Sequence, residues 1–173
     1  MKKNLLLTAL LVFTTVFGFS QADRFWSANY ESPSAITQDK SVARQSYPKS
    51  IKLFNLNFAG FQQELFSVVG KSSKHSTVIS LPNPDGNIEQ FEVFEASNFE
   101  PDLQARFPEI RAYSGKGITD KYATLKLSIS PQGIQTMVFR TESDNEFMEP
   151  YSQDHKVYSV YSSHREKGSL PWS

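Results

Sequence analysis

The sequence predicts an α+β fold in which about six antiparallel strands carry two short helices on one sheet face. Three observations predict it. Strict alternation of apolar and polar residues over 122–129 is typical of a strand with one buried face and one solvent-exposed face. Turn signals such as Asp85-Gly86 and Pro131-Gln132-Gly133 separate the apolar runs at short intervals, which favours hairpins. Apolar residues recur at steps of three and four in only two places, so we expect two helices.

Each predicted helix has end signals as well as apolar spacing. The first covers residues 58–69, with Asn57 able to cap its start and Gly70 able to close its end. The second covers residues 99–107 and stops before Pro108. The apolar positions that set the spacing are Phe58, Phe61, Leu65 and Val68 in the first helix and Phe99, Leu103 and Phe107 in the second.

Strands are predicted where apolar runs lie between turn signals. After a short apolar piece at 110–113, Gly115 and Gly117 predict a sharp turn. The predicted strands cover residues 77–81, 88–95, 122–129, 134–140, 147–151 and 157–161.

The first 22 residues have the pattern of a secretory signal peptide. Lys2 and Lys3 precede an apolar run over residues 5–19, and Ser20 and Ala22 supply the small residues that signal peptidase needs. We expect cleavage after Ala22 and a secreted or periplasmic location. The run is shorter than the roughly 20 apolar residues that span a bilayer, so we expect no stable membrane anchor after cleavage.

The remaining 151 residues are the size of one domain. Residues 23–50 are polar, contain two prolines and lack a sustained period, so we interpret them as a leader arm whose aromatic residues can dock on the domain. Residues 51–162 form the predicted domain, and residues 163–173 form a linker or tail.

Charge and cysteine content exclude several classes of protein. The 18 basic and 18 acidic side chains balance, whereas a nucleic-acid-binding protein usually has a basic surplus, so we expect no nucleic-acid partner. Zero cysteines exclude disulfide scaffolds, thiolate zinc sites and cysteine nucleophiles.

The histidines do not form a zinc site. A catalytic zinc needs three protein ligands, and two histidines must lie four apart on a helix to share one ion. His75, His155 and His164 offer no such pair. The sequence also lacks the Gly-x-Ser-x-Gly pattern of serine hydrolases.

Three other candidate sites have plainer interpretations. Glu89, Glu92 and Glu95 could pair as acid and base, but a solvated strand face explains them better. Residues 114–117 lack phosphate-loop spacing, and residues 83–86 form a hairpin turn rather than a calcium loop. We therefore assign no catalytic, cofactor-binding or metal-binding residue and expect no cofactor.

Aromatic residues remain as the candidate binding surface. A domain of this size cannot bury all of its aromatic side chains completely, so we expect some to contact a partner. Those on predicted strands or beside them are Phe91, Phe94, Tyr113, Tyr122, Phe139, Tyr151, Tyr158 and Tyr161. Partner-binding residues are not identified beyond this set.

Residues 91–139 carry several motifs in a fixed order. They are Phe91-Glu92-Val93-Phe94-Glu95-Ala96-Ser97, then Pro101-x-Leu103-x-Ala105-Arg106-Phe107-Pro108-x-Ile110-Arg111, then Gly115-x-Gly117-Ile118, then residues 123–129 and Gly133. With the later segment 147–151, this order resembles the N-terminal prodomain of secreted zinc metallopeptidases of the reprolysin-like type found in Bacteroidota. The resemblance extends over about residues 53–162.

The resemblance implies a propeptide that assists folding of a metallopeptidase catalytic domain and keeps it latent, in cis or in trans. No His-Glu-x-x-His motif is present, so we expect this chain itself to be no enzyme and to be either the front of a precursor or a free-standing module. The alternatives are a secreted surface-binding or glycan-binding module that uses exposed aromatics, and a small periplasmic enzyme.

Overall fold

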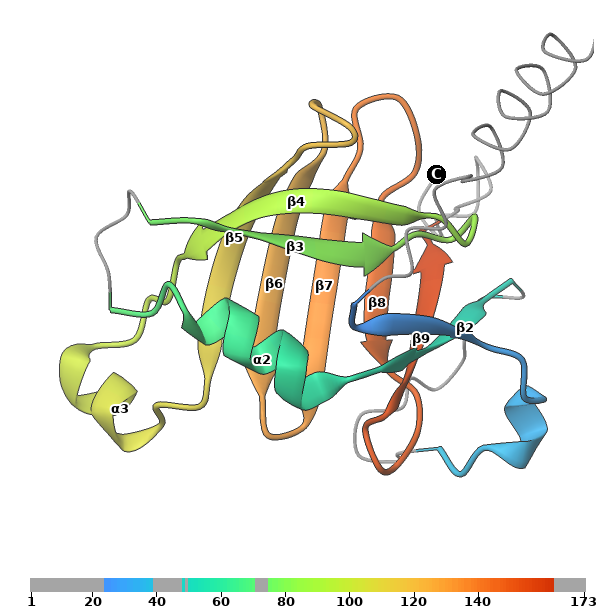
Figure 1. The fold of residues 1–173 in the computed structure, drawn as a ribbon, viewed down its shortest axis with the longest axis horizontal. Helices are drawn as coiled ribbons and strands as arrows, with labels where there is room; N and C mark the ends of the chain where they lie inside the picture. Colours follow the sequence, from blue (N-terminus) through green and yellow to red (C-terminus); the bar gives the residue numbers. More distant parts are fainter. Residues whose placement is uncertain (1–23, 39–47, 49, 71–74, 164–173) are drawn as a thin grey trace, which may run out of the picture.

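A single curled sheet dominates the computed structural model, which describes residues 24–38, 48, 50–70 and 75–163. Its nine strands have the order β1-β2-β9-β8-β7-β6-β5-β4-β3, and all neighbours pair antiparallel. The sheet curves into a half-barrel around one helix (Figure 1). The predicted α+β fold with six strands and two packed helices is therefore wrong. The described protein is mostly β, and only one of its helices is longer than six residues.

The six predicted strands are nevertheless present as β3, β4, β6, β7, β8 and β9, and with β5 they form a continuous meander. The strands are β1 Trp26–Asn29, β2 Lys52–Leu56, β3 Thr77–Pro82, β4 Ile88–Glu95, β5 Arg111–Gly117, β6 Thr124–Ser130, β7 Gly133–Phe139, β8 Glu146–Pro150 and β9 Val157–Ser162. The helical segments are η1 Pro33–Ala35, α2 Phe58–Phe66 and α3 Pro101–Arg106.

Glycines with positive φ make two of the hairpins possible. Gly86 has a φ of 95° in the β3–β4 turn, and Gly133 has a φ of 109° where β7 begins. L-residues with a side chain rarely adopt these angles. A Cβ at Gly133 would also lie 2.8 Å from both Pro150 Cγ and the Tyr158 hydroxyl, so no side chain fits there. Both turns were predicted from the sequence.

Helix α2 connects β2, the second strand of the order, to edge strand β3, and it crosses the concave face of the sheet between them (Figure 1). Asn57 caps it as predicted, because its Oδ1 accepts a hydrogen bond of 3.2 Å from the Gly60 amide. Phe61 and Leu65 are fully buried against the inward side chains of the strands. Burial of two large apolar side chains fixes the helix on the sheet.

The two edges of the sheet approach each other beside this helix. Trp26 on edge strand β1 donates a hydrogen bond of 2.8 Å from its indole Nε1 to the Ser80 carbonyl on edge strand β3. Its ring also meets Phe61 and Tyr158 edge to face, at centroid distances of 5.7 and 5.6 Å. A side chain thus bridges two edge strands that are not paired with each other, which helps to hold the sheet in its curled form.

Three strands were not predicted. In β2, Leu53 and Phe54 are both buried because apolar clusters cover both faces, so the period of two is lost. In β5, Gly115 is part of a strand, and the predicted sharp turn there is wrong. A Cβ at Gly115 would lie 2.7 Å from Val93 Cγ1 and 3.0 Å from the Glu92 carbonyl oxygen. Glycine is needed at this position for close packing, not for a turn.

The N-terminal arm contributes to the domain over its described part, which includes β1 and η1. Ile36 packs with Leu53, Tyr151 and Val157 in a small second cluster. Gln38 Nε2 donates a hydrogen bond of 2.6 Å to the Tyr151 hydroxyl. The predicted signal peptide and nearly all of the predicted tail lie outside the described residues.

Candidate interaction surface

The pairing register places one row of outward side chains across five strands of the sheet. Ser114 pairs with Lys126, Lys126 with Met137, Met137 with Phe147, and Phe147 with Tyr161. In each strand the neighbouring residues face the opposite way, toward α2 and the core. The row therefore crosses the outer face of the half-barrel.

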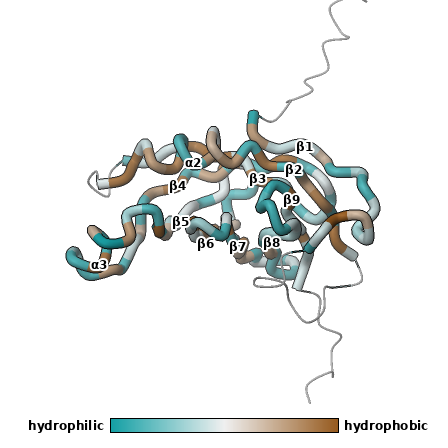
Figure 2. Tube along the Cα trace, turned by 90° about the horizontal axis from the view of Figure 1, so that it is seen from below, coloured by the Kyte–Doolittle hydropathy of each residue, from teal (hydrophilic) through white to brown (hydrophobic). Residues whose placement is uncertain are grey.

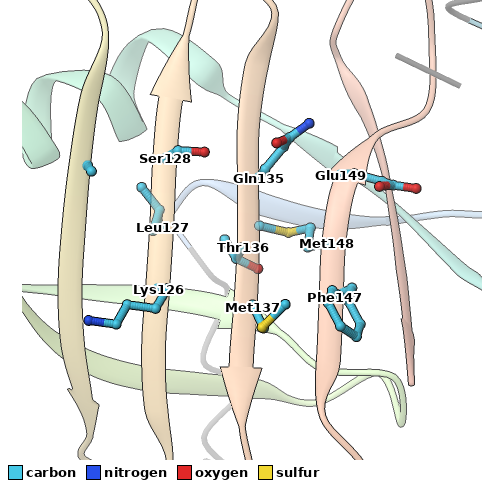
Figure 3. A pocket seen from close by; sticks show the side chains of 10 residues that line it. Lys126, Leu127, Ser128, Gln135, Thr136, Met137, Phe147, Met148 and Glu149 are labelled. Carbon is cyan, nitrogen blue, oxygen red and sulfur yellow. The ribbon is translucent and has the colours of Figure 1, made fainter. Parts of the chain in front are cut away.

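A shallow hollow of about 400 Å³ lies along this row and is open to solvent (Figure 3). Small side chains at Ala112 and Ser128 leave space in it. The Met137 side chain lies beside Phe147, whereas Lys126 points away from both, toward β5, at the margin of the hollow. The lining residues are Ala112, Lys126, Leu127, Ser128, Gln135, Thr136, Met137, Phe147, Met148 and Glu149.

The chemistry of the hollow suits docking. Phe147 stacks on Tyr161 with ring centroids 5.8 Å apart and an interplanar angle of 18°, which fixes the aromatic part. Lys126 Nζ donates a hydrogen bond of 2.7 Å to Ser114 Oγ, so this cation is held at the margin. Glu149 adds a carboxylate on the opposite side of the hollow from Lys126. An apolar centre between fixed polar groups is the usual composition of a protein-binding patch.

Most of the predicted aromatic surface is buried. Two aromatic residues of the predicted set are exposed, Tyr122 at 79% and Phe139 at 40%, and Phe94 is half-buried. Tyr122 precedes β6, and Phe139 ends β7 on the same outward side as Met137. The other five are buried, namely Phe91, Tyr113, Tyr151, Tyr158 and Tyr161.

Arg140 is the centre of an ionic network at one end of the half-barrel. Its guanidinium contacts Glu89 at 2.6 Å, Asp120 at 3.0 Å and Glu146 at 2.7 Å. Burial opposes its charge, but these three carboxylates outweigh that effect and raise the pKa of Arg140. Burial raises the pKa of Glu146, while hydrogen bonds from the Tyr122 amide and from Arg140 lower the pKa of Asp120. We interpret this network as structural.

A second polar cluster lies where β4 and β5 meet the end of α2. Glu95 accepts hydrogen bonds from Arg111 at 2.9 Å, from the Gly70 amide at 2.9 Å and from Ser97 at 3.1 Å. Burial would raise the pKa of Glu95, but these donors outweigh it and hold the pKa below 4.5. Burial also raises the pKa of the nearby Tyr113 hydroxyl, which has no hydrogen-bond partner among the described residues.

The structure does not bring the predicted site candidates together into a catalytic centre. His75 precedes β3, whereas His155 lies in the β8–β9 turn with a φ of 55°, and His164 lies outside the described residues. Within the described ranges, His, Asp and Glu form no group of three that could hold a metal ion. Among the three glutamates weighed as acid and base, Glu92 accepts a hydrogen bond from Ser76 and points away from Glu95.

The two loop candidates have structural explanations. Residues 114–117 belong to β5, so they form no phosphate loop. In the β3–β4 turn, Asn83 Oδ1 accepts hydrogen bonds from the amides of Asp85 and Asn87, at 3.1 and 2.9 Å. The Asn83 side chain also donates to Glu89, so it stabilises the turn.

Sequence reasoning missed the hollow because it depends on the register of four strands, β5 to β8. Alternation over 134–140 does place Gln135, Met137 and Phe139 on one face, and that signal was available. No local pattern shows which outward residues of β6 and β8 lie beside Met137.

Comparison of the chain with family models, with curated proteins and with solved structures found no match in any of the three. The fold and the outer face thus define a curled, mostly β module with a candidate docking surface. Among the described residues, no helix has the length and apolar character of a membrane span.

Proposed function

We propose that this chain is a non-catalytic secreted module that assists folding of a reprolysin-like zinc metallopeptidase domain and keeps that domain latent. The sequence resemblance over residues 91–139 supports a metallopeptidase domain as the partner. The observation that carries the proposal is the open hollow on the outer sheet face, with Met137 and Phe147 at its apolar centre (Figure 3).

The hollow fits a protein surface better than a small substrate. It is shallow and open to solvent, whereas sites for small molecules usually enclose most of the ligand. Lys126 is exposed at the margin of the hollow, so the rim presents a cation that can pair with an acidic group on a partner. A rigid sheet also loses little conformational entropy on binding, which favours affinity.

Latency in this proposal works by steric cover. The chain has no cysteine, so a thiolate cannot ligate the zinc of the protease. The sheet face instead covers the substrate cleft and excludes peptides while it is bound. The same preformed face stabilises the native catalytic domain over its unfolded chain, because it binds only the native form.

A glycan-binding module is the second candidate. The observation that favours it is the exposure of Tyr122 at 79% beside Phe139 at 40%, since sugar rings stack on exposed aromatic faces. Replacement of Tyr122 by Ala should abolish retention on insoluble polysaccharide if this candidate holds. Under the proposed function the same variant should still inhibit the protease fully.

The test is titration of the reprolysin-like catalytic domain of the same organism with the mature chain, with peptidase activity and refolding yield as readouts. We expect stoichiometric loss of activity and a higher yield of refolded protease. Met137→Asp should weaken inhibition at least about tenfold, because it puts a charge in the apolar centre. The control Val78→Asp, at an outward residue 48% exposed on the remote strand β3, should inhibit normally. Absence of both inhibition and folding assistance by the unaltered chain would overturn the proposal.

A further inference from the structure

The connection between β4 and β5 stands clear of the rest of the domain. We call residues 96–110 the excursion; it contains α3 and lies beside the end of β5 (Figures 1 and 2). None of the six residues of α3, all of them described, is buried. The second predicted helix therefore exists, but the prediction that it packs on the sheet is wrong.

Hydrogen bonds fix the base of the excursion to β5. The Ala96 amide donates to the Ala112 carbonyl at 2.8 Å, and the Ala112 amide donates to Ser97 Oγ at 3.1 Å. On the other side, Arg111 Nε donates to the Pro108 carbonyl at 2.8 Å. Both ends of the excursion are thereby held to one strand.

Hydrogen bonds also order the part of the excursion that contains α3. A helix of this length does not form alone in water, because nucleation is costly. Gln104 supports it by donating two hydrogen bonds of 3.0 Å from Nε2, to the carbonyls of Phe107 and Ile110. Pro101 begins the helix with a preset φ. The excursion is thus ordered without a core of its own.

Three large apolar side chains of this ordered segment face water. Phe99 is 42% exposed, Leu103 is 39% exposed and Phe107 is 40% exposed, and they are spaced four residues apart. Apolar surface in contact with water is unfavourable relative to the same surface buried. A segment that is held in place and yet leaves such groups exposed is suited to bury them against a partner.

The charges around these side chains indicate the partner's chemistry. Residues 98–110 contain Glu100, Asp102 and Glu109 but only one base, Arg106, which gives a formal charge of −2. Arg106 lies over the Phe107 ring, 6.0 Å from its centroid. An acidic, apolar projection fits an apolar pocket with Lys or Arg at its rim. The same charge disfavours contact between two copies of the excursion.

The excursion is continuous with the hollow on the outer sheet face. Ala112 lines the hollow, and its backbone holds both Ala96 and Ser97. A partner that covers the hollow therefore comes within reach of α3. We propose that the excursion is a second docking element, which inserts Phe99, Leu103 and Phe107 into a basic-rimmed apolar pocket of the metallopeptidase domain; this inference rests on the proposed function.

The test compares two triple variants of the full mature chain by their affinity for the catalytic domain. The excursion variant carries Phe99→Ser, Leu103→Ser and Phe107→Ser. The control variant carries Tyr30→Ser, Ile118→Ser and Tyr122→Ser, at residues 93%, 45% and 79% exposed. Thermal unfolding of both variants should match the unaltered chain, because none of these side chains is buried.

We expect the excursion variant to bind at least about a hundredfold more weakly, since anchor side chains dominate binding energy, and the control to bind normally. The charge variant Glu100→Gln, Asp102→Asn, Glu109→Gln should associate more slowly at low salt and show less salt dependence. If the unaltered chain binds and the excursion variant binds equally well, the docking role is overturned and the proposed function stands. If the unaltered chain does not bind, both are overturned.

Discussion

Arg140 Nη2 lies 2.6 Å from Glu89 Oε2, although two strands separate β7, which ends just before Arg140, from β4 in the sheet. The contact runs across the concave side of the half-barrel and is nearly closed to solvent, since the Arg140 side chain is 7% exposed. The pair therefore links distant strands and holds the curvature that shapes the outer face.

Replacement of Arg140 by Met should destabilise the protein by about 3–5 kcal/mol, because it leaves Glu89, Asp120 and Glu146 without their shared cation. Urea unfolding at neutral pH measures the change. Arg24→Met is the control, since the Arg24 side chain is 78% exposed and its pair with Glu64 spans 3.7 Å. A loss below about 1 kcal/mol at Arg140 would show that the network does not hold the curl.

The β6–β7 turn should not tolerate a side chain at its glycine. Gly133→Ala places a methyl group at a φ of 109° and against Pro150 and Tyr158, so we expect a loss of about 1–3 kcal/mol. Gly70→Ala also has a positive φ, of 68°, but open space around it, so it should cost less. Equal costs in thermal unfolding would contradict the steric explanation.

Truncation of a core leucine and of an excursion leucine to alanine should change the free energy of unfolding by very different amounts. Leu65→Ala leaves a cavity at a fully buried position of α2 and should lower the free energy of unfolding by about 2–5 kcal/mol. Leu103→Ala on α3 should change the free energy of unfolding by less than about 0.5 kcal/mol, because that side chain packs on no core. Chemical denaturation of both variants checks this contrast, and a large loss at Leu103 would mean that the excursion contributes to folding.

Acid should weaken the fold through Glu95. Its pKa is lower in the folded protein than the ordinary 4.5, so its contribution is complete above that value and is lost as the pH falls through the folded pKa. Glu146 acts in the opposite direction, because its folded pKa is raised. Thermal unfolding between pH 7 and pH 3 should show a smaller decline for Glu95→Gln than for the unaltered chain. If the stability of Glu95→Gln declines as much as that of the unaltered chain, Glu95 is excluded as a source of the acid sensitivity.

The sequence predicted six strands correctly because each lies between turn residues that act locally, such as Gly86 and Gly133. It missed β1, β2 and β5. In β2, burial on both faces at Leu53 and Phe54 removes the local signal, and in β5 close packing at Gly115 does so. The four-residue spacing of the second helix predicted burial, but none of the six described residues of α3 is buried. The hydrogen bonds of Ser97 and Arg111 hold the base of that segment to β5.

The interaction surface was less predictable than the strands. Aromatic content alone pointed to Tyr113 and Tyr158, which the curl of the sheet buries. The hollow beside Met137 arises from pairing between strands, and the pairing order follows from the tertiary fold.

We propose that the outer sheet face and the excursion contact one metallopeptidase domain. Hydroxyl-radical footprinting of the mature chain, alone and with the catalytic domain, tests it most directly, because it reads side chains individually. We expect Met137, Phe99 and Phe107 to become protected while Tyr30 and Tyr122 remain as reactive as before. Unchanged reactivity at Met137 and Phe107 under saturating protease, or protection confined to Tyr30 and Tyr122, would contradict it.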